Sequence, residues 1–82
     1  MPEPQITVYG TSWCGDCWRS KRLLDDHNVP YRWVDIDQDA EAADFVKRVN
    51  NGNRAVPTII FPQGDSLTEP SNTHLMARLG LE

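Results

Sequence analysis

Two cysteines, Cys14 and Cys17, are the residues of this 82-residue chain whose types and spacing most clearly suggest chemistry. Two residues separate them, and they stand between a β-rich run at residues 6–9 and a run with helical character. A dithiol with this spacing and placement is typical of thiol–disulfide redox sites. A helix that begins at Cys14 directs free backbone N–H groups and the positive end of its dipole at that sulfur. We therefore expect Cys14 to be the exposed, attacking thiolate and Cys17, one turn later, to be the buried thiol that resolves the mixed disulfide.

A zinc site is the competing interpretation of two nearby cysteines, and a structural zinc needs about four ligands. The remaining candidates, His27 and His74, lie at no recognised ligand spacing and on separate predicted helices. We therefore expect a redox site with no metal ion and no bound cofactor.

The composition narrows the class of partner and the compartment. Eight Lys and Arg stand against twelve Asp and Glu, and the net charge of −4 argues against a nucleic acid partner. No run is long and apolar enough to span a membrane, and because no basic stretch is followed by an apolar stretch near Met1, we expect no secretory signal. Together with a free dithiol, these features predict a monomer in the reducing cytoplasm that does not bind membranes.

Hydrophobic periodicity and turn residues divide the chain into elements in the order βαβαββα. Strands are predicted over residues 6–9, 31–36, 58–61 and 66–68, and a first helix over residues 14–27. A second helix follows a cap at Asp37 or Asp39 and ends near residues 50–53, and a third lies between Ser71 and Gly80. Residues 1–5 are expected to form an extended tail. The pattern predicts one α/β domain over residues 1–82, whose first two strands are parallel.

This order, with Cys-x-x-Cys after the first strand and Val56-Pro57-Thr58 before the third, resembles the thioredoxin fold in its minimal, glutaredoxin-sized form. The resemblance covers nearly the whole chain. It implies a mixed four-stranded sheet with helices on both faces. It also implies that Pro57 is cis and faces the cysteines, so that the backbone of Val56 can pair with an extended substrate.

Three separated segments are similar to the mycoredoxin group of glutaredoxin-like proteins. They are Thr11-Ser12-Trp13-Cys14-Gly15-Asp16-Cys17, Val49-Asn50-Asn51-Gly52-Asn53-Arg54-Ala55-Val56-Pro57-Thr58 and Gly64-Asp65-Ser66-Leu67-Thr68-Glu69-Pro70-Ser71. Three segments in register are far more specific than Cys-x-x-Cys alone.

The resemblance implies a thiol–disulfide oxidoreductase that reduces mixed disulfides between proteins and a low-molecular-weight thiol, with mycothiol as co-substrate. Its partners would be that thiol and thiolated or disulfide-bonded proteins. One alternative is an electron donor to ribonucleotide reductase or other protein disulfides, although residues 67–71 lack the Trp-Ser-Gly-Phe-like motif of such donors. Another is an iron–sulfur cluster carrier, in which Cys14 and an external thiol ligate a cluster shared by two chains.

Several residues near the cysteines are candidates for binding or tuning. Trp13 is expected to offer a flat apolar surface near the attacking sulfur, and Trp18 to serve packing. Asp16 replaces the aromatic residue usual in the mycoredoxin group; its charge favours the helix dipole but opposes thiolate formation at Cys14. Arg54 is either a contact for the thiol or a partner, or only a loop cation. Lys21 and Arg22 either screen the Asp16 carboxylate or, as we expect, simply lie on the solvated face of the first helix.

Thr68 and Glu69 stand where glutaredoxins that use glutathione usually have two glycines. Glycines let the backbone approach the γ-glutamyl carboxylate of glutathione closely, whereas Glu69 adds bulk and a like charge. Mycothiol, a cysteine derivative on an amino sugar and inositol, has no carboxylate. We therefore expect Thr68 and Glu69 to favour mycothiol; the alternative is that Glu69 is an exposed turn residue that points away.

Overall fold

The structure, a computed structural model, describes residues 5–81, so the expected tail lies outside the described residues except for Gln5. The elements follow in the predicted order: β1 (Ile6–Gly10), α1 (Gly15–Asp26), β2 (Tyr31–Asp35), α2 (Ala40–Val49), β3 (Thr58–Ile60), β4 (Ser66–Thr68) and α3 (Asn72–Leu79). The βαβαββα order is therefore confirmed, and predicted ends differ by about a residue, as is usual at frayed termini.

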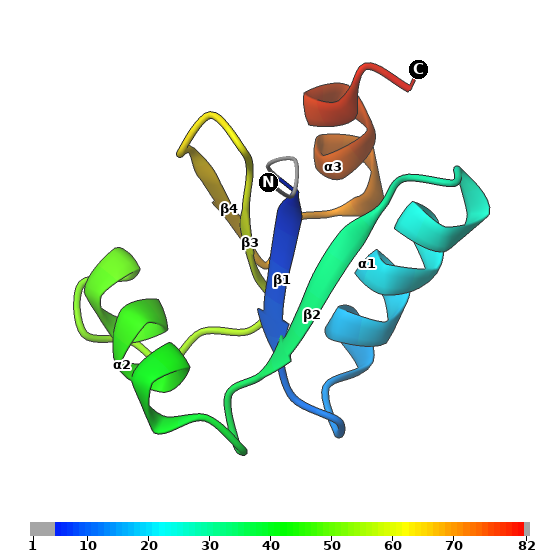
Figure 1. Ribbon diagram of the computed structural model, residues 1–82. Helices are drawn as coiled ribbons and strands as arrows, with labels where there is room; N and C mark the ends of the chain where they lie inside the picture. The colour runs from blue at the N-terminus through cyan, green and yellow to red at the C-terminus, as the bar shows by residue number, and fades with distance from the viewer. Residues whose placement is uncertain (1–4, 82) are drawn as a thin grey trace.

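The four strands form one mixed sheet in the order β2-β1-β3-β4. β1 runs parallel to β2, as a connecting helix requires, and antiparallel to β3. β3 and β4 form an antiparallel hairpin in which Ile59 faces Leu67. The central position of β1 brings its C-terminal end beside the loop that leads into β3 (Figure 1). Cys14, which follows β1, lies against Val56 of that loop.

Helices cover both faces of the sheet, as predicted (Figure 1). α1 and α3 pack on one face over a core of Ile6, Val8, Leu23, Leu24, Ile59, Phe61 and Leu75. α2 packs on the other face over Ile36, Ala42 and Val46, with Tyr9, Val34 and Val56 against them. β1 supplies both cores because successive side chains of a strand point to opposite faces.

Each helix begins at a side chain that caps it. Cys14, Asp39 and Ser71 are the N-caps, and each accepts a hydrogen bond from a backbone N–H in the first turn. Of the two predicted caps for α2, Asp39 takes this place, and Asp37 is free for another contact. Across residues 5–81, no helix is long and apolar enough to cross a membrane.

Candidate active site

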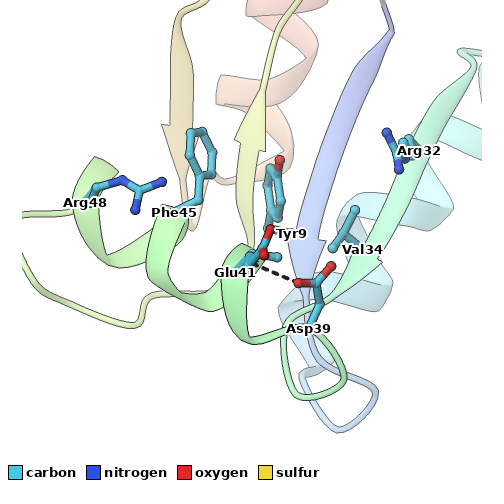
Figure 2. A pocket seen from close by; sticks show the side chains of 8 residues that line it. Tyr9, Arg32, Val34, Asp39, Glu41, Phe45 and Arg48 are labelled. Carbon is cyan, nitrogen blue, oxygen red and sulfur yellow. Dashed lines mark hydrogen bonds between the residues drawn. The ribbon is translucent and has the colours of Figure 1, made fainter.

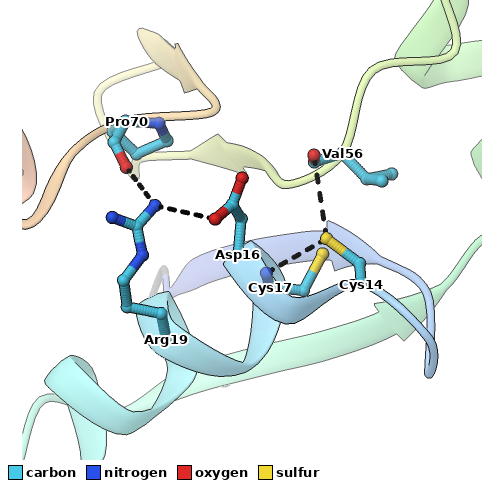
Figure 3. A network of polar contacts seen from close by, with 6 residues as sticks. All are labelled: Cys14, Asp16, Cys17, Arg19, Val56 and Pro70. Atoms are coloured by element: carbon cyan, nitrogen blue, oxygen red, sulfur yellow. Dashed lines mark hydrogen bonds and ion pairs between the residues drawn. The ribbon is translucent and has the colours of Figure 1, made fainter.

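Cys14 lies at the start of α1, as its N-cap. Its Sγ accepts a hydrogen bond from the backbone N–H of Cys17 at 3.1 Å, and the thiol lies 3.8 Å from the carbonyl oxygen of Val56 (Figure 3). The expectation of an exposed Cys14 was wrong, since only 8% of the residue is exposed. Val56, in the loop before β3, lies against the sulfur and covers part of it.

Cys17 is fully buried in the first turn of α1. This burial, together with a hydrogen bond to Cys14, raises the pKa of the Cys17 thiol to about 12. Both cysteines are free thiols. Cys17 therefore keeps its proton at neutral pH and does not compete with Cys14 as the attacking group.

Gly10 makes the space that Cys17 occupies. A Cβ atom at Gly10 would lie 2.5 Å from Cys17 Sγ and 2.8 Å from the ring of Trp33. Every larger residue would therefore displace the resolving sulfur or the indole. In the sequence, Gly10 is a glycine directly before the cysteine loop, a signal that suggests only a turn.

The Val56-Pro57 bond is cis, as the resemblance implies. Pro57 is buried, and its carbonyl oxygen accepts a hydrogen bond of 2.8 Å from the backbone N–H of Glu69. The loop after β4 is thereby attached to the loop before β3. Both loops are held beside Cys14.

A cavity of about 460 Å³ opens beside Cys14. It is lined by Trp13, Cys14, Gly15, Asp16, Arg54, Ala55, Val56 and Glu69. The fold therefore brings together most of the predicted site residues, although they come from three distant segments. Within the described part of the chain, no three His, Cys, Asp or Glu side chains are grouped so as to hold a metal ion.

Thr68 is not among the residues that line this cavity. Its hydroxyl donates a hydrogen bond of 2.6 Å to Asn50 Oδ1, and Asn50 Nδ2 donates one of 3.0 Å to Thr58 Oγ1. The expectation that Thr68 contacts the low-molecular-weight thiol is therefore wrong. Thr68 instead connects β4 to the end of α2. Asn50, which the sequence presented only as a helix stop, anchors both ends of the loop that carries Val56 and Pro57.

The charge of Asp16 is paired. Arg19 lies 3.3 Å from Asp16 Oδ1 and donates a hydrogen bond of 3.3 Å to the carbonyl oxygen of Pro70 (Figure 3). Arg19 thus offsets a carboxylate close to Cys14 and links α1 to the loop after Glu69. The sequence signal was an i, i+3 pair of opposite charges, which was overlooked.

The basic residues further along α1 divide between two roles. Lys21 is half-buried, and its ammonium group lies over the rings of Trp18 and Trp33, 4.2 and 3.9 Å from their centroids, so it is only partly solvated. Arg22 is exposed and lies 3.9 Å from Asp26, as expected of a solvated residue.

Trp18 is 53% exposed, so its expected packing role in the interior was wrong. It follows buried Cys17, and one residue along a helix turns the side chain by about 100°, away from the buried face. Its indole N–H donates a hydrogen bond of 2.8 Å to the carbonyl oxygen of Ser12. Trp18 therefore rests on the outside of the loop that carries the cysteines.

Asp37 connects two residues of the cavity wall and was missed in the sequence except as a possible helix cap. Its Oδ2 accepts a hydrogen bond of 2.8 Å from Trp13 Nε1, and its Oδ1 pairs with the guanidinium of Arg54. The hydrogen bond from Arg54, and then that from Trp13, hold the pKa of the Asp37 carboxyl below its usual range. The positions of Trp13 and Arg54 therefore depend on a third loop.

The chain is similar to known redox proteins. The Glutaredoxin family model matches residues 6–65. A Mycobacterium tuberculosis H37Rv protein named "Putative glutaredoxin Rv3198A" is 47% identical over 74 residues, which cover 90% of this chain and 88% of that protein. Mycoredoxin 1 of Corynebacterium glutamicum is 39% identical over 74 residues, which cover 90% of this chain and 91% of that protein.

The fold agrees with these relatives. The crystal structure of a variant of a thioredoxin-like protein superposes on this chain with a TM-score of 0.84 at 25% identity. The match covers 98% of this chain and 100% of that protein's chain. The matched family residues include both cysteines, and the cysteine at the N-cap lies beside a cis-proline loop. Sequence, fold and site thus lead to one assignment: the chain belongs to the glutaredoxin family and is a thiol–disulfide oxidoreductase.

Proposed function

We propose that this glutaredoxin-family chain reduces mixed disulfides between proteins and a low-molecular-weight thiol, with mycothiol as co-substrate. The observation that carries the proposal is the position of Cys14 Sγ. It accepts the N–H of Cys17 at a helix N-cap and stands at the edge of a cavity of about 460 Å³. Backbone N–H groups at this place stabilise a thiolate, which is the attacking form of cysteine.

The reaction proceeds by two exchanges of sulfur. The Cys14 thiolate attacks the thiol's sulfur in the mixed disulfide, forms a new S–S bond with it, and the protein cysteine leaves as a thiolate that takes up a proton. A second molecule of the thiol, as thiolate, then attacks the adduct on Cys14. The products are the free protein thiol, the disulfide of the small thiol and the regenerated Cys14 thiolate.

Cys17 is not needed for either exchange. Its pKa of about 12 keeps it protonated at neutral pH, so it is a poor attacking group while it remains buried. We infer that the monothiol route serves the mixed disulfides. Cys17 acts when a disulfide between two protein cysteines is the substrate.

The charges of the cavity support a thiol without carboxylates. Arg54 is paired with Asp37, and Asp16 with Arg19. Glu69 also lines the cavity, and no ion pair among residues 5–81 includes it. The carboxylates of glutathione would therefore meet an acidic side chain and no free cation, whereas mycothiol avoids this repulsion. The similarity to a relative named Mycoredoxin 1 supports the same choice.

A comparison of matched substrates tests the proposal. One cysteine-containing peptide is converted to its mixed disulfides with mycothiol, bacillithiol and glutathione, and kcat/KM is measured with the same free thiol as reductant. We expect the mycothiol pair to be turned over fastest. Equal turnover of mycothiol and glutathione pairs would overturn the choice of thiol, and no turnover of any pair would overturn the function.

The variant Glu69→Gln isolates the charge. It should raise kcat/KM for the glutathione pair by less than about tenfold, because an exposed charge contributes about 1 kcal/mol or less. The mycothiol pair should respond little. Glu41→Gln, the same substitution in the first turn of α2, is the matched control and should change neither. An equal response of both thiols to Glu69→Gln would show that Glu69 does not act on the ligand's charge.

A further inference from the structure

We propose that Asp37 is a positioning residue that sets the thiol specificity of the Cys14 site. It does so by fixing Trp13 in the cavity wall and by withholding the Arg54 cation from the bound thiol. The proposal rests on the function proposed above and adds to it a residue that does not itself line the cavity.

Asp37 joins three loops that are far apart in the chain. It lies between β2 and α2, 24 residues after Trp13 and 17 residues before Arg54, and its two carboxylate oxygens bind one each. The backbone N–H of Asp37 donates a hydrogen bond of 2.9 Å to Asp35 Oδ1, which fixes the loop that presents the carboxylate. Both partners of Asp37 line the cavity beside Cys14.

Trp13 depends on this contact because little else covers it. The residue is 68% exposed, and its indole N–H is directed at Asp37 Oδ2. An exposed aromatic ring without such a bond loses rotational freedom when it closes on a ligand, and that loss lowers affinity. Asp37 orders the ring before the thiol arrives, so the apolar wall of the cavity is already formed.

Asp37 makes Trp13 ready for the ligand, but it keeps the charge of Arg54 away from the ligand. Its guanidinium would be the natural partner of a ligand carboxylate, since both have planar, forked geometry. In the structure this charge is taken up by Asp37 Oδ1. Arg19 is likewise engaged by Asp16 and the carbonyl oxygen of Pro70. A thiol compound that carries a carboxylate would therefore find neither arginine free to pair with it.

Two substitutions at Asp37 separate these effects from a loss of structure. Asp37→Asn removes the charge but retains one acceptor oxygen, and Asp37→Ala removes both. With Asp37→Asn, kcat/KM for the glutathione mixed disulfide should rise about fivefold at low salt, the equivalent of one exposed charge contact. For the mycothiol mixed disulfide it should fall about threefold, and further with Asp37→Ala, as the indole loses its anchor.

The changes should appear in KM and leave kcat nearly constant, because Asp37 does not contact the reacting sulfur. The glutathione gain should fade with added salt. It should also disappear in the double variant Asp37→Asn/Arg54→Gln, because the gain requires the freed guanidinium. A general weakening of the fold would not raise the activity toward one thiol while lowering it toward the other.

The matched control is Asp65→Asn. Asp65 also pairs with an arginine, Arg78, at 2.7 Å, and it lies outside the cavity. It should change neither substrate's kinetics. If the wild-type chain reduces the mycothiol pair but Asp37→Asn moves both thiols in the same direction or neither, the role of Asp37 is wrong and the proposed function stands. If the wild-type chain reduces no mixed disulfide, the proposed function fails and this inference with it.

Discussion

Among the hollows on the described part of this protein, two are built from similar residue types. The cavity beside Cys14 measures about 460 Å³, and the hollow between α2 and the sheet about 320 Å³. The second is lined by Tyr9, Arg32, Val34, Asp39, Glu41, Ala42, Phe45 and Arg48 (Figure 2). Both combine aromatic rings with charges of both signs, so composition does not distinguish them.

The contacts of the lining residues do distinguish the two hollows. In the second hollow, Asp39 caps α2 through the N–H of Ala42, and the rings of Tyr9 and Phe45 lie 5.2 Å apart. The first contact starts α2 and the second attaches α2 to the sheet. In the first, the contacts of Asp37 with Trp13 and Arg54 run between loops and hold side chains of the cavity wall beside Cys14. A charged, aromatic hollow therefore indicates a site only when its contacts hold side chains about a reactive group.

Substitutions of the cysteines, which belong to the first hollow, should have the largest effect on activity. Cys14→Ser should abolish every exchange, because the attacking sulfur is lost. Cys17→Ser should still reduce small-thiol mixed disulfides while losing reactions with protein disulfides, measured by coupled turnover with each substrate. If Cys17→Ser were as inactive as Cys14→Ser toward every substrate, the monothiol route would be wrong.

Gly10→Ala should be the next most severe change. The added Cβ would overlap Cys17 Sγ and the ring of Trp33, so we expect a loss of about 1–3 kcal/mol in the free energy of unfolding, as for overpacked cores. Urea denaturation measures this loss. Gly15→Ala is the control, since its Cβ would meet no atom within 4 Å and alanine favours a helix. Equal stability of the two variants would show that Cys17 has room to move.

The buried thiol should also make stability depend on pH. Because burial raises the pKa of Cys17 from 9.0 to about 12, the unfolded chain loses this proton first as the pH rises. The stabilisation is complete below about pH 9 and is lost toward pH 12. Under reducing conditions, the difference in unfolding free energy between wild type and Cys17→Ser should decline across that range. A constant difference would mean that the folded Cys17 ionises like an exposed thiol.

The smallest effect on activity is expected from a substitution in the second hollow. Arg32→Gln removes an exposed cation that lines it, and kcat/KM for mixed disulfides should change by less than about twofold, as for an isolated surface charge. Thermal unfolding provides the check on folding. A fall of about threefold or more for the mycothiol pair, as expected of Asp37→Asn, would make the second hollow part of the site.

Local patterns were enough to predict much of this protein. The alternation of apolar residues, the cap Ser71 and the stop at Gly80 are determined within a few residues, so the order of elements followed from the sequence. The dithiol at a strand-to-helix junction likewise placed Cys14 and Cys17, because a helix N-terminus acts on the residue that begins it. The resemblance supplied the cis bond before Pro57.

Contacts between distant loops were decided only by the tertiary structure. Asp37 stood in a predicted loop, but its partners lie 24 and 17 residues away, and no local pattern connects them. The same holds for Thr68, which bonds to Asn50 outside the cavity, and for Gly10, whose need for a small residue arises from Cys17 and Trp33. The sequence by itself determined which groups could react and where the elements begin. The packing of those elements decided which side chains meet, because burial and charge pairing are properties of the assembled fold.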